Sequence, residues 1–444
     1  MSLIADLHLH SKYSRAVSQK MDLREIAFWA KKKGINLVGI PDWTHPLFFR
    51  EIKENLIEKN EGVFILKNHP QFSDINFIFS TEVSLIYSQG DKQRRIHTLI
   101  LSPSIEVCEK VIKKLQDYGA NLLSDGRPIL GISAKDLLSL LLEIDQRILL
   151  IPCHIWTPWF SLYGSKSGFD SIDEAFGELS SYVYAVETGL SSDPIMNWQI
   201  KELETRAIVS FSDAHSGQKL GREATVFITN KTNKTYKTYI TYSTITNALK
   251  QNPNAELKIG YTIEFFPEEG KYHWSGHRQC NIRLSPDEVK KNGKICPVCQ
   301  KPLTIGVENR VVDLSYKILK KEDLIFVKNK YDLTFVLDKE KKHLPFVSLV
   351  PLMEILNEIY HSPKKVSEEY EKITASTTEF EFLMKTPYED IEKIAGKKLR
   401  QAIEIVRQRR VFVDPGYDGV FGVVKIFQNH VDEKNEPINQ QRLF

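Results

Sequence analysis

The chain has 444 residues, of which 42% are hydrophobic and 26% are charged. This balance excludes a disordered or fibrous protein, and the length allows one large catalytic domain with one or two smaller ones. The 60 Lys and Arg residues nearly balance the 57 Asp and Glu residues, for a net charge of +3. A nucleic-acid surface would therefore have to be a local patch.

The sequence contains no signal for a membrane or for secretion. The N-terminus, MSLIADLHLH, lacks a basic segment followed by a long apolar run, and no apolar stretch approaches the roughly 20 residues that a membrane span needs. The five cysteines are unevenly spaced, which favours metal binding in a reducing compartment over disulfides. We expect a cytoplasmic, nucleoid-associated protein with no membrane partner.

Residues 1–265 alternate short apolar runs with amphipathic stretches, which is typical of a β/α sheet or barrel. Several of the predicted strands end in His, Asp or Glu, as in LIADLHLH, INFIFSTEV, RILLIPCHI and AIVSFSDAHS. The carboxyl ends of the strands form the reaction face in β/α folds. We therefore expect these side chains to lie close together although they are far apart in the sequence.

The first predicted strand carries His8 and His10, which alternate with Asp6 and so project from one face. Two histidines in a strand are a weak indication on their own, but further candidates follow later strands: Glu82, His97, His154, Asp213 and His215. Imidazoles mixed with carboxylates suit Zn, Mn or Fe, and Mg or Mn where oxygen ligands dominate. The pattern predicts a site for divalent metals.

These motifs, in this order, resemble the polymerase and histidinol phosphatase (PHP) superfamily of metal-dependent phosphoesterases over residues 1 to about 230. The resemblance implies a distorted (β/α)7 barrel in which two or three metal ions activate water. It also implies that one metal is held by His8, His10, Glu82 and Asp213, and another by His154 and His215. Glu82 would bridge metals, and His97 would complete a third site.

The second motif of that superfamily usually reads Asp-His, whereas this chain has Asp42 followed by Trp43. We expect His45 to supply the imidazole instead. Asp42 and Glu187 follow predicted strands, where each could ligate a metal, take a proton or cap a backbone group. Asp193, before Pro194, is predicted as a helix cap, with a catalytic or DNA role as the alternative.

Residues 266–310 form a small module with His277-x2-Cys280 and Cys296-x2-Cys299, the spacing of a closed four-ligand zinc ribbon. His273 is the rival fourth ligand, but His277 forms the tighter pair with Cys280. Four protein ligands leave no open position, so we expect this Zn to be structural.

Residues 311–430 are predicted to form a mainly helical DNA-binding domain. Residues 271–320 contain ten basic and four acidic residues, and residues 393–410 contain seven basic residues and one acidic residue. Such runs are often solvated helix faces, but beside a phosphoesterase they favour a phosphate-backbone track. The candidates in the second run are Lys397, Lys398, Arg400 and Arg407.

Nearly the whole chain resembles the endonuclease Q family, on WTPWFSLYGSKSGFD, TGLSSDP, CPVCQKPLTIGV and VRQRRVFVDPGYDGVFG. The resemblance implies hydrolysis of the phosphodiester 5′ to deaminated bases (uracil, hypoxanthine, xanthine) and at abasic sites, in double- or single-stranded DNA, with active-site Mg, Mn or Zn. Such an enzyme extrudes its target base. Trp156, Trp159 and Phe160 are predicted to line the pocket or wedge the duplex, with core packing as the alternative.

Two other functions stay open: a PHP phosphatase for a small phosphate ester, and a non-catalytic DNA-binding repair scaffold. Residues 431–444 are predicted as a flexible tail. Its end resembles the Gln-x-x-Leu-Phe peptide that docks on the bacterial sliding clamp. In that interpretation Leu443 and Phe444 anchor in a groove and Gln440 binds the backbone.

Overall fold

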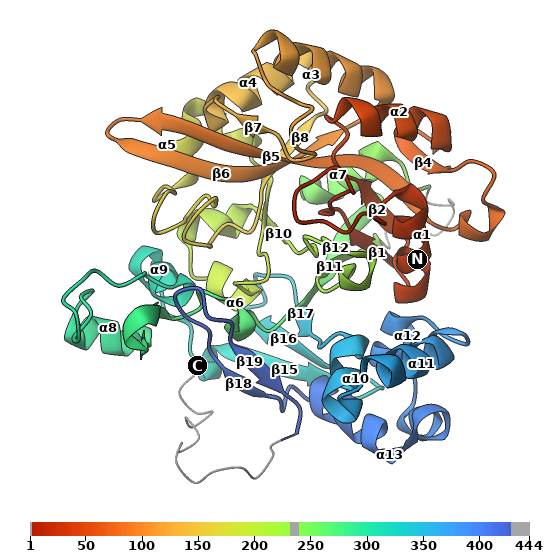
Figure 1. The fold of residues 1–444 in the computed structure, drawn as a ribbon, viewed down its shortest axis with the longest axis vertical. Coiled ribbons are helices and arrows are strands. Elements are labelled where there is room, and N and C mark those ends of the chain that lie inside the picture. Colours follow the sequence, from red (N-terminus) through yellow and green to blue (C-terminus); the bar gives the residue numbers. More distant parts are fainter. Residues whose placement is uncertain (1, 231–238, 428–444) are drawn as a thin grey trace.

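The computed structural model describes residues 2–230 and 239–427, and Figure 1 shows the arrangement of their elements. The predicted clamp-binding residues Gln440, Leu443 and Phe444 lie outside the described residues, so clamp binding stays a prediction. Within the described ranges, no helix combines the length and the apolar composition that crossing a membrane requires.

The first half of the chain forms a ring of strands. Strand β1 pairs in parallel with β2, β2 pairs in parallel with β5, and β6 runs antiparallel to both β5 and β8. The parallel pair β9–β10 completes the ring, since Ile155 N–H after β8 donates to Glu187 O and a parallel bridge joins Leu9 to Ala214. The bounds are β1 (Ser2–Asp6), β2 (Leu37–Ile40), β5 (Asn76–Gln89), β6 (Lys92–Ser102), β8 (Leu149–Pro152), β9 (Ala185–Glu187) and β10 (Ala207–Val209). The predicted distorted β/α barrel is confirmed, and the reversed strand β6 is one distortion.

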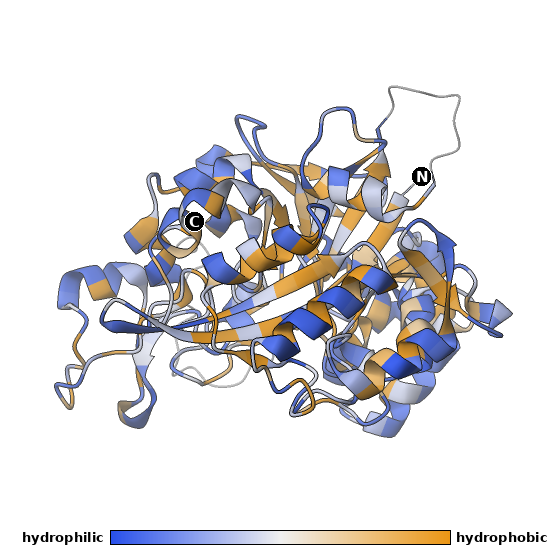
Figure 2. Cartoon of the chain, turned by 90° about the horizontal axis from the view of Figure 1, so that it is seen from above, coloured by the Kyte–Doolittle hydropathy of each residue, from blue (hydrophilic) through white to orange (hydrophobic). Residues whose placement is uncertain are grey.

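Helices cover the outside of this ring, and Figure 2 shows the apolar strands beneath helices whose outer surfaces are hydrophilic. They are α1 (Leu23–Lys33), α2 (Pro46–Asn55), α3 (Ile105–Asp117), α4 (Ala134–Ile144) and α5 (Ile172–Phe176). Two more helices lie elsewhere: α6 (Pro194–Asn197) follows the carboxyl end of β9, and α7 (Tyr242–Leu249) packs with the apolar residues of the barrel interior. Local sequence sets their ends. Asp22 caps the first turn of α1, and Gly34 ends α1 in a left-handed conformation (φ 86°).

The barrel interior has an apolar floor. Inward positions of the ring strands carry buried side chains such as Ala5, Ile78, Leu99, Ile151 and Val209. Toward the carboxyl ends of most of these strands the inward positions change to His, Glu and Asp. Alternation continues this inward register to Glu82, His97, Glu187 and Asp213, whereas His8, His10 and His154 follow the ends of β1 and β8.

The sheet continues beyond the barrel into the last third of the chain. From β1 it runs through β11 (Ala224–Thr229), β12 (Leu257–Glu264), β17 (Phe346–Ser348), β16 (Thr334–Asp338) and β15 (Leu324–Lys328). On the other side, β4 (Val63–Leu66) and β7 (Ile129–Leu130) pair with β5, and β3 (Leu56–Asn60) pairs with β4. The region predicted as mainly helical thus first adds three strands to the main sheet.

Four helices near the end of the described chain form a cluster against the barrel, drawn in blue in Figure 1. They are α10 (Leu352–Tyr360), α11 (Pro363–Thr374), α12 (Glu379–Met384) and α13 (Tyr388–Arg407), and Gly396 kinks α13 with non-helical angles (φ 83°, ψ 170°). A buried ion pair of 2.7 Å joins Lys33 of α1 to Glu379 of α12.

The predicted zinc module holds β13 (Ser275–His277), β14 (Ile282–Leu284), α8 (Pro286–Asn292) and α9 (Val307–Leu314). The chain returns to this module after α13 through β18 (Phe412–Asp414) and β19 (Val423–Lys425). Trp274 N–H donates to Gly416 O at 2.9 Å, and Arg283 pairs with Asp414 at 2.6 Å. The independence of the predicted domains stays a prediction.

Candidate active site

Glu82 lies at the centre of the ligand candidates and is fully buried. Its Oε1 is 2.7 Å from His97 Nδ1 and 3.2 Å from His154 Nε2, and its Oε2 is 3.3 Å from His10 Nε2. A carboxylate whose two oxygens face different imidazoles has the geometry of a bridging ligand.

The strand positions of two of these residues differ from the prediction. We expected Glu82 and His97 near strand ends, but Glu82 lies in the middle of β5 and His97 in the middle of β6. The reason is that β5 and β6 continue past the site as a long antiparallel hairpin with its turn near Gly90 (φ 59°). Antiparallel pairing places His97 opposite Ser84, so it lies beside Glu82.

The structure brings nearly all predicted metal ligands together. In each of four groups, donor atoms lie within 4.8 Å of one another. The groups are His8, His10 and Glu82; His8, Cys153 and Glu187; His10, Asp213 and His215; and Glu82, His97 and His154. Shared members join the groups into one connected cluster, which fits more than one ion.

His8 is held in a single orientation by Glu187. Both Glu187 oxygens lie close to His8 Nδ1, at 2.9 and 3.0 Å, and Oε2 also accepts from the His154 N–H at 2.8 Å. The other ring nitrogen of His8, Nε2, is buried and has no hydrogen-bond partner among the described residues. A carboxylate that takes the Nδ1–H leaves the Nε2 lone pair for a metal.

Asp213 and His215 follow β10, as the DAH motif predicted. Asp213 Oδ1 is 3.0 Å from His10 Nε2, and the His215 ring lies 4.7 Å from the His10 ring. The backbone is left-handed at Asp213 (φ 47°), as it is at Asp42 (φ 46°) and His154 (φ 30°). Non-glycine residues in this region are uncommon and gather at functional sites.

Asp42 contacts the cluster through His10. Its Oδ2 accepts from Ser11 N–H at 2.7 Å, and its Oδ1 lies 3.5 Å from His10 Nδ1. His45, three residues on, does not reach the ligands. It precedes the first turn of α2 and stacks on Tyr13 at 4.5 Å, and it belongs to none of the ligand groups found among the described residues. The structure thus places this predicted ligand outside the cluster.

Asp193 caps helix α6, because its side chain accepts from Met196 N–H at 3.0 Å. This is the capping geometry that the following Pro194 predicted. Asp193 belongs to no ligand group in the described part of the chain, so a catalytic role for it stays a prediction.

Sequence reasoning missed two residues of the site. Cys153 adjoins His154, and its position directly after a predicted strand was a signal that could have found it. Arg127 lies in a loop before β7, with its Nη1 3.0 Å from Glu82 Oε2. No strand or motif marks it.

The charges of the cluster depend on one another. Burial lowers the pKa of His97 to about 4. Burial also opposes the charged forms of His8 and His10, but nearby carboxylates, Glu187 and Asp213 foremost, outweigh it and raise the pKa of both imidazoles. Against the effect of burial, His97 and Arg127 hold the pKa of Glu82 well below its usual value. Glu82 is therefore ionised at neutral pH and can attract cations.

The zinc module brings its four predicted ligands together. Donor atoms of His277, Cys280, Cys296 and Cys299 lie within 4.8 Å of one another, and Cys299 Sγ is 3.7 Å from His277 Nδ1. His273 is instead buried, with Nε2 3.6 Å from Glu308. Three thiols and one imidazole at this spacing suit a tetrahedral structural Zn.

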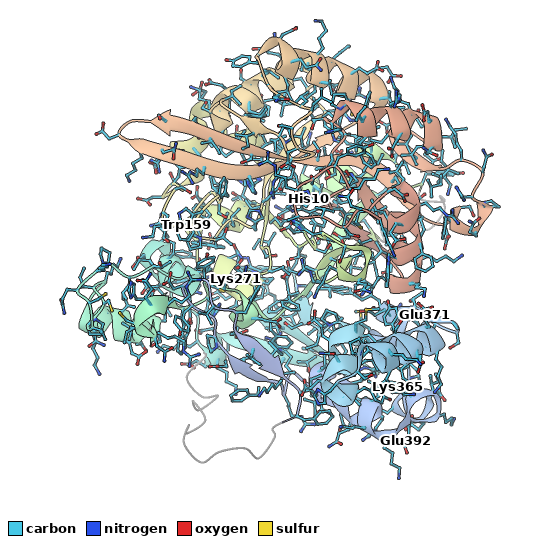
Figure 3. The ribbon with its side chains drawn as sticks, viewed as in Figure 1. His10, Trp159, Lys271, Lys365, Glu371 and Glu392 are labelled. Carbon is cyan, nitrogen blue, oxygen red and sulfur yellow. The ribbon has the colours of Figure 1, made fainter. Side chains whose placement is uncertain are left out.

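The predicted aromatic residues divide into two kinds. Trp156 is core: it is 1% exposed, its Nε1–H donates to Asn197 at 2.9 Å, and it packs on Tyr163. Phe160 and Trp159 are only partly buried. The Phe160 ring lies 4.8 Å from His97, and Trp159 meets Tyr272 of the zinc module at 5.4 Å. In Figure 3, His10 lies within the barrel and Trp159 toward the zinc module.

The predicted basic residues of α13 also divide. Lys397 and Lys398 are exposed directly after Gly396, and Arg400 pairs with Glu404 at 2.8 Å. Arg407 is only 1% exposed, and its guanidinium donates to the backbone carbonyls of Leu383, Tyr331, Phe382 and Thr386. The prediction that Arg407 contacts DNA is therefore corrected: its donors are used within the protein.

No family model matches the chain. The uncharacterized protein MJ0043 of Methanocaldococcus jannaschii is 28% identical over 293 residues, which are 65% of this chain and 33% of that protein. The uncharacterized protein YqxK of Bacillus subtilis is 27% identical over 333 residues, 70% of this chain and 77% of that protein. The chain thus matches about a third of the length of the first relative.

Two solved structures match nearly the whole chain. The lesion-specific endonuclease PfuEndoQ of Pyrococcus furiosus has a TM-score of 0.77 at 27% identity, covering 96% of this chain and 95% of that one. An endonuclease Q bound to a 27-mer duplex with an abasic lesion at the active site has a TM-score of 0.78 at 27% identity, covering 98% and 100%.

The chain folds as a PHP-type distorted β/α barrel followed by a small module whose His and three Cys suit zinc. Its architecture over nearly the whole chain is that of endonuclease Q.

Proposed function

We propose that this protein is a metal-dependent DNA endonuclease that hydrolyses the phosphodiester 5′ to damaged nucleotides. The observation that carries the proposal is the combination of an endonuclease Q fold over 98% of the chain with a connected ligand cluster centred on Glu82. The substrates we propose are deaminated bases (uracil, hypoxanthine and xanthine) and abasic sites.

The cluster fits divalent metals by its donors. His8 Nε2 is buried and lacks a hydrogen-bond partner among the described residues, and buried polar atoms are rarely left so. His10 and His97 are buried beside the Glu82 carboxylate. With Glu82, His154, Asp213 and His215, these residues would hold Mg, Mn or Zn. Bound divalent ions supply an activated water and stabilise negative charge on the phosphate.

The remaining polar residues have positioning roles in this proposal. Glu187 fixes the tautomer of His8, and Asp42 supports His10 while its other oxygen holds Ser11. Glu187 and Asp42, the two carboxylates that we predicted as catalytic, would therefore act indirectly, by orienting the imidazoles that hold the metals.

DNA would lie across the open face of the cluster. Phe160 beside His97 and Trp159 beside Tyr272 are partly exposed aromatic residues suited to stacking on or wedging beside an extruded nucleotide. Lys397 and Lys398 on α13 would contact the phosphate backbone.

The direct test incubates the protein with end-labelled duplexes that contain uracil, hypoxanthine, xanthine or an abasic site, with Mg, Mn or Zn. We expect one cut 5′ to the lesion and none in the undamaged duplex. Equal cutting of damaged and undamaged duplexes would refute lesion specificity.

The same samples separate the alternatives. A PHP phosphatase for small esters would hydrolyse p-nitrophenyl phosphate but leave the duplexes intact. A repair scaffold would bind the damaged duplex without cutting it with any of the three metals. Docking on the sliding clamp stays a separate prediction, tested by deleting residues 440–444 and measuring clamp binding.

A further inference from the structure

Arg127 reaches the ligand cluster from the loop between α3 and β7. Its Nη1 donates to Glu82 Oε2 at 3.0 Å. Among the described residues, no other Lys or Arg forms an ion pair with a carboxylate of the ligand groups. A single fixed cation therefore lies beside the central carboxylate.

The loop that carries Arg127 is fixed on both sides of it. Gly126 N–H donates to Tyr13 O at 3.0 Å, and Ser84 N–H donates to Pro128 O at 3.0 Å. A Cβ on Gly126 would lie 2.3 Å from an oxygen of Asp42, so only glycine permits this close approach. The backbone of Arg127 is thus held against two elements of the site.

Its side chain differs from that of a structural arginine. Arg407 is buried and donates to four carbonyls, whereas the Arg127 side chain is 25% exposed and, within the described chain, donates one hydrogen bond. A guanidinium has five N–H donors. Most donors of Arg127 therefore remain for a ligand.

The chemistry of the site indicates that ligand. A phosphodiester that approaches Glu82 and Asp213 meets negative charge, and a guanidinium offers paired donors that match two phosphate oxygens. We propose that Arg127 binds a non-bridging oxygen of the scissile phosphate and stabilises its growing negative charge during hydrolysis. This inference rests on the proposed phosphodiesterase function.

The test compares Arg127→Met and Arg127→Lys with the wild-type protein and with Arg147→Met. Arg147 is a matched control because it precedes β8, at the opposite end of the strand from His154. Single-turnover cleavage of the abasic duplex should fall about 100-fold in Arg127→Met, the size of effect seen when one transition-state donor is removed. Arg127→Lys should cut about 10-fold faster than Arg127→Met. Arg147→Met should cut at the wild-type rate.

A second readout is independent of cleavage. Affinity for the abasic duplex is measured with Ca²⁺, once with the normal phosphate and once with a methylphosphonate at the scissile linkage. Arg127→Met should weaken binding of the normal duplex about threefold to tenfold and leave binding of the methylphosphonate duplex unchanged, because that group lacks the charged oxygen. Equal weakening for both duplexes would overturn the proposal.

A merely structural role would lower the melting temperature or the bound-metal content of both Arg127 variants. If the melting temperature or the metal content falls while the cleavage rate per bound metal ion stays at the wild-type value, the inference is also overturned. The wild-type arm tests the proposed function separately. If the wild type leaves the duplex intact, the comparison is made on bis(p-nitrophenyl) phosphate, and inactivity there refutes both proposals together.

Discussion

His8 Nδ1 lies 2.9 Å from Glu187 Oε1, although the two residues are 179 positions apart in the chain. The contact joins the segment after β1 to the end of β9 across the barrel. It is buried on both sides, so water cannot replace either partner.

The first prediction tests this contact. Glu187→Gln keeps the size of the side chain but removes the charge that holds His8. We expect a 10- to 100-fold loss in metal affinity, as is typical when a partner of a ligating histidine is lost. Metal titration of cleavage measures it, with the exposed Glu143→Gln as the control. An unchanged titration curve would show that His8 needs no orientation by Glu187.

The second prediction concerns the ligands themselves. His8→Ala, Glu82→Ala and Asp213→Ala should each abolish cleavage, while affinity for damaged duplex stays within about threefold. The reason is that the ligands hold the metals, whereas basic side chains elsewhere hold the backbone. Rate and affinity are measured on one duplex. Cleavage retained in all three variants would contradict the site.

The third prediction separates the zinc module from the active site. Cys296→Ser should release one Zn per chain and lower the melting temperature, because metal binding at a structural site contributes to folding free energy. Cys108→Ala removes another buried thiol, outside the ligand groups, and should keep its Zn. Metal content and thermal unfolding are measured together. Full Zn content in Cys296→Ser would refute this ligand set.

The fourth prediction distinguishes two kinds of basic residue on α13. Replacing Lys397 and Lys398 by Ala should weaken DNA binding and reduce its salt dependence by about one to two counterions, without changing stability. Arg407→Ala should instead destabilise the fold by about 2–5 kcal/mol, because four backbone carbonyls lose a buried charged partner. Affinity at several salt concentrations and urea unfolding separate the two effects.

The fifth prediction concerns pH. Glu264 is buried and accepts from Ser210 and Thr188, and burial raises its pKa to about 8. The folded chain therefore keeps a proton that the unfolded chain loses above about pH 4.3. Stability from this group is complete below that pH and is lost as the pH rises through about 8.

Glu264→Gln mimics the protonated form. The variant should gain about 1–3 kcal/mol over wild type at pH 8.5 and almost nothing at pH 5. Urea unfolding at the two pH values measures this difference. An equal effect at both values would mean that the carboxyl does not titrate in this range.

Residue pattern predicted much of the site and less of its surroundings. His8, His10, His154 and Asp213 follow apolar runs, and barrel topology brings such ends together, so the cluster was predictable. The short spacing between His277 and Cys280 likewise favoured His277 over His273 as the fourth zinc ligand. Glu82 was placed at a strand end because nothing in INFIFSTEV shows that the strand continues into a hairpin.

The sequence did not reveal the roles of two arginines, Arg407 and Arg127. Arg407 has the same charge as Lys397, but it lies four positions after Ile403 on the apolar stripe of α13, so it is buried. Arg127 lies in a loop, and only the paired contacts of Gly126 and Pro128 place it in the cluster. Such contacts depend on tertiary packing, which a single sequence does not reveal.

The pairing of β12 with β17 has a consequence for dividing the protein. A fragment that ends near residue 265 would retain the barrel but leave one side of β12 without a neighbour. An uncovered strand edge recruits other chains and promotes aggregation. The last third of the chain thus protects the barrel as a solubility partner, independently of any contact with DNA.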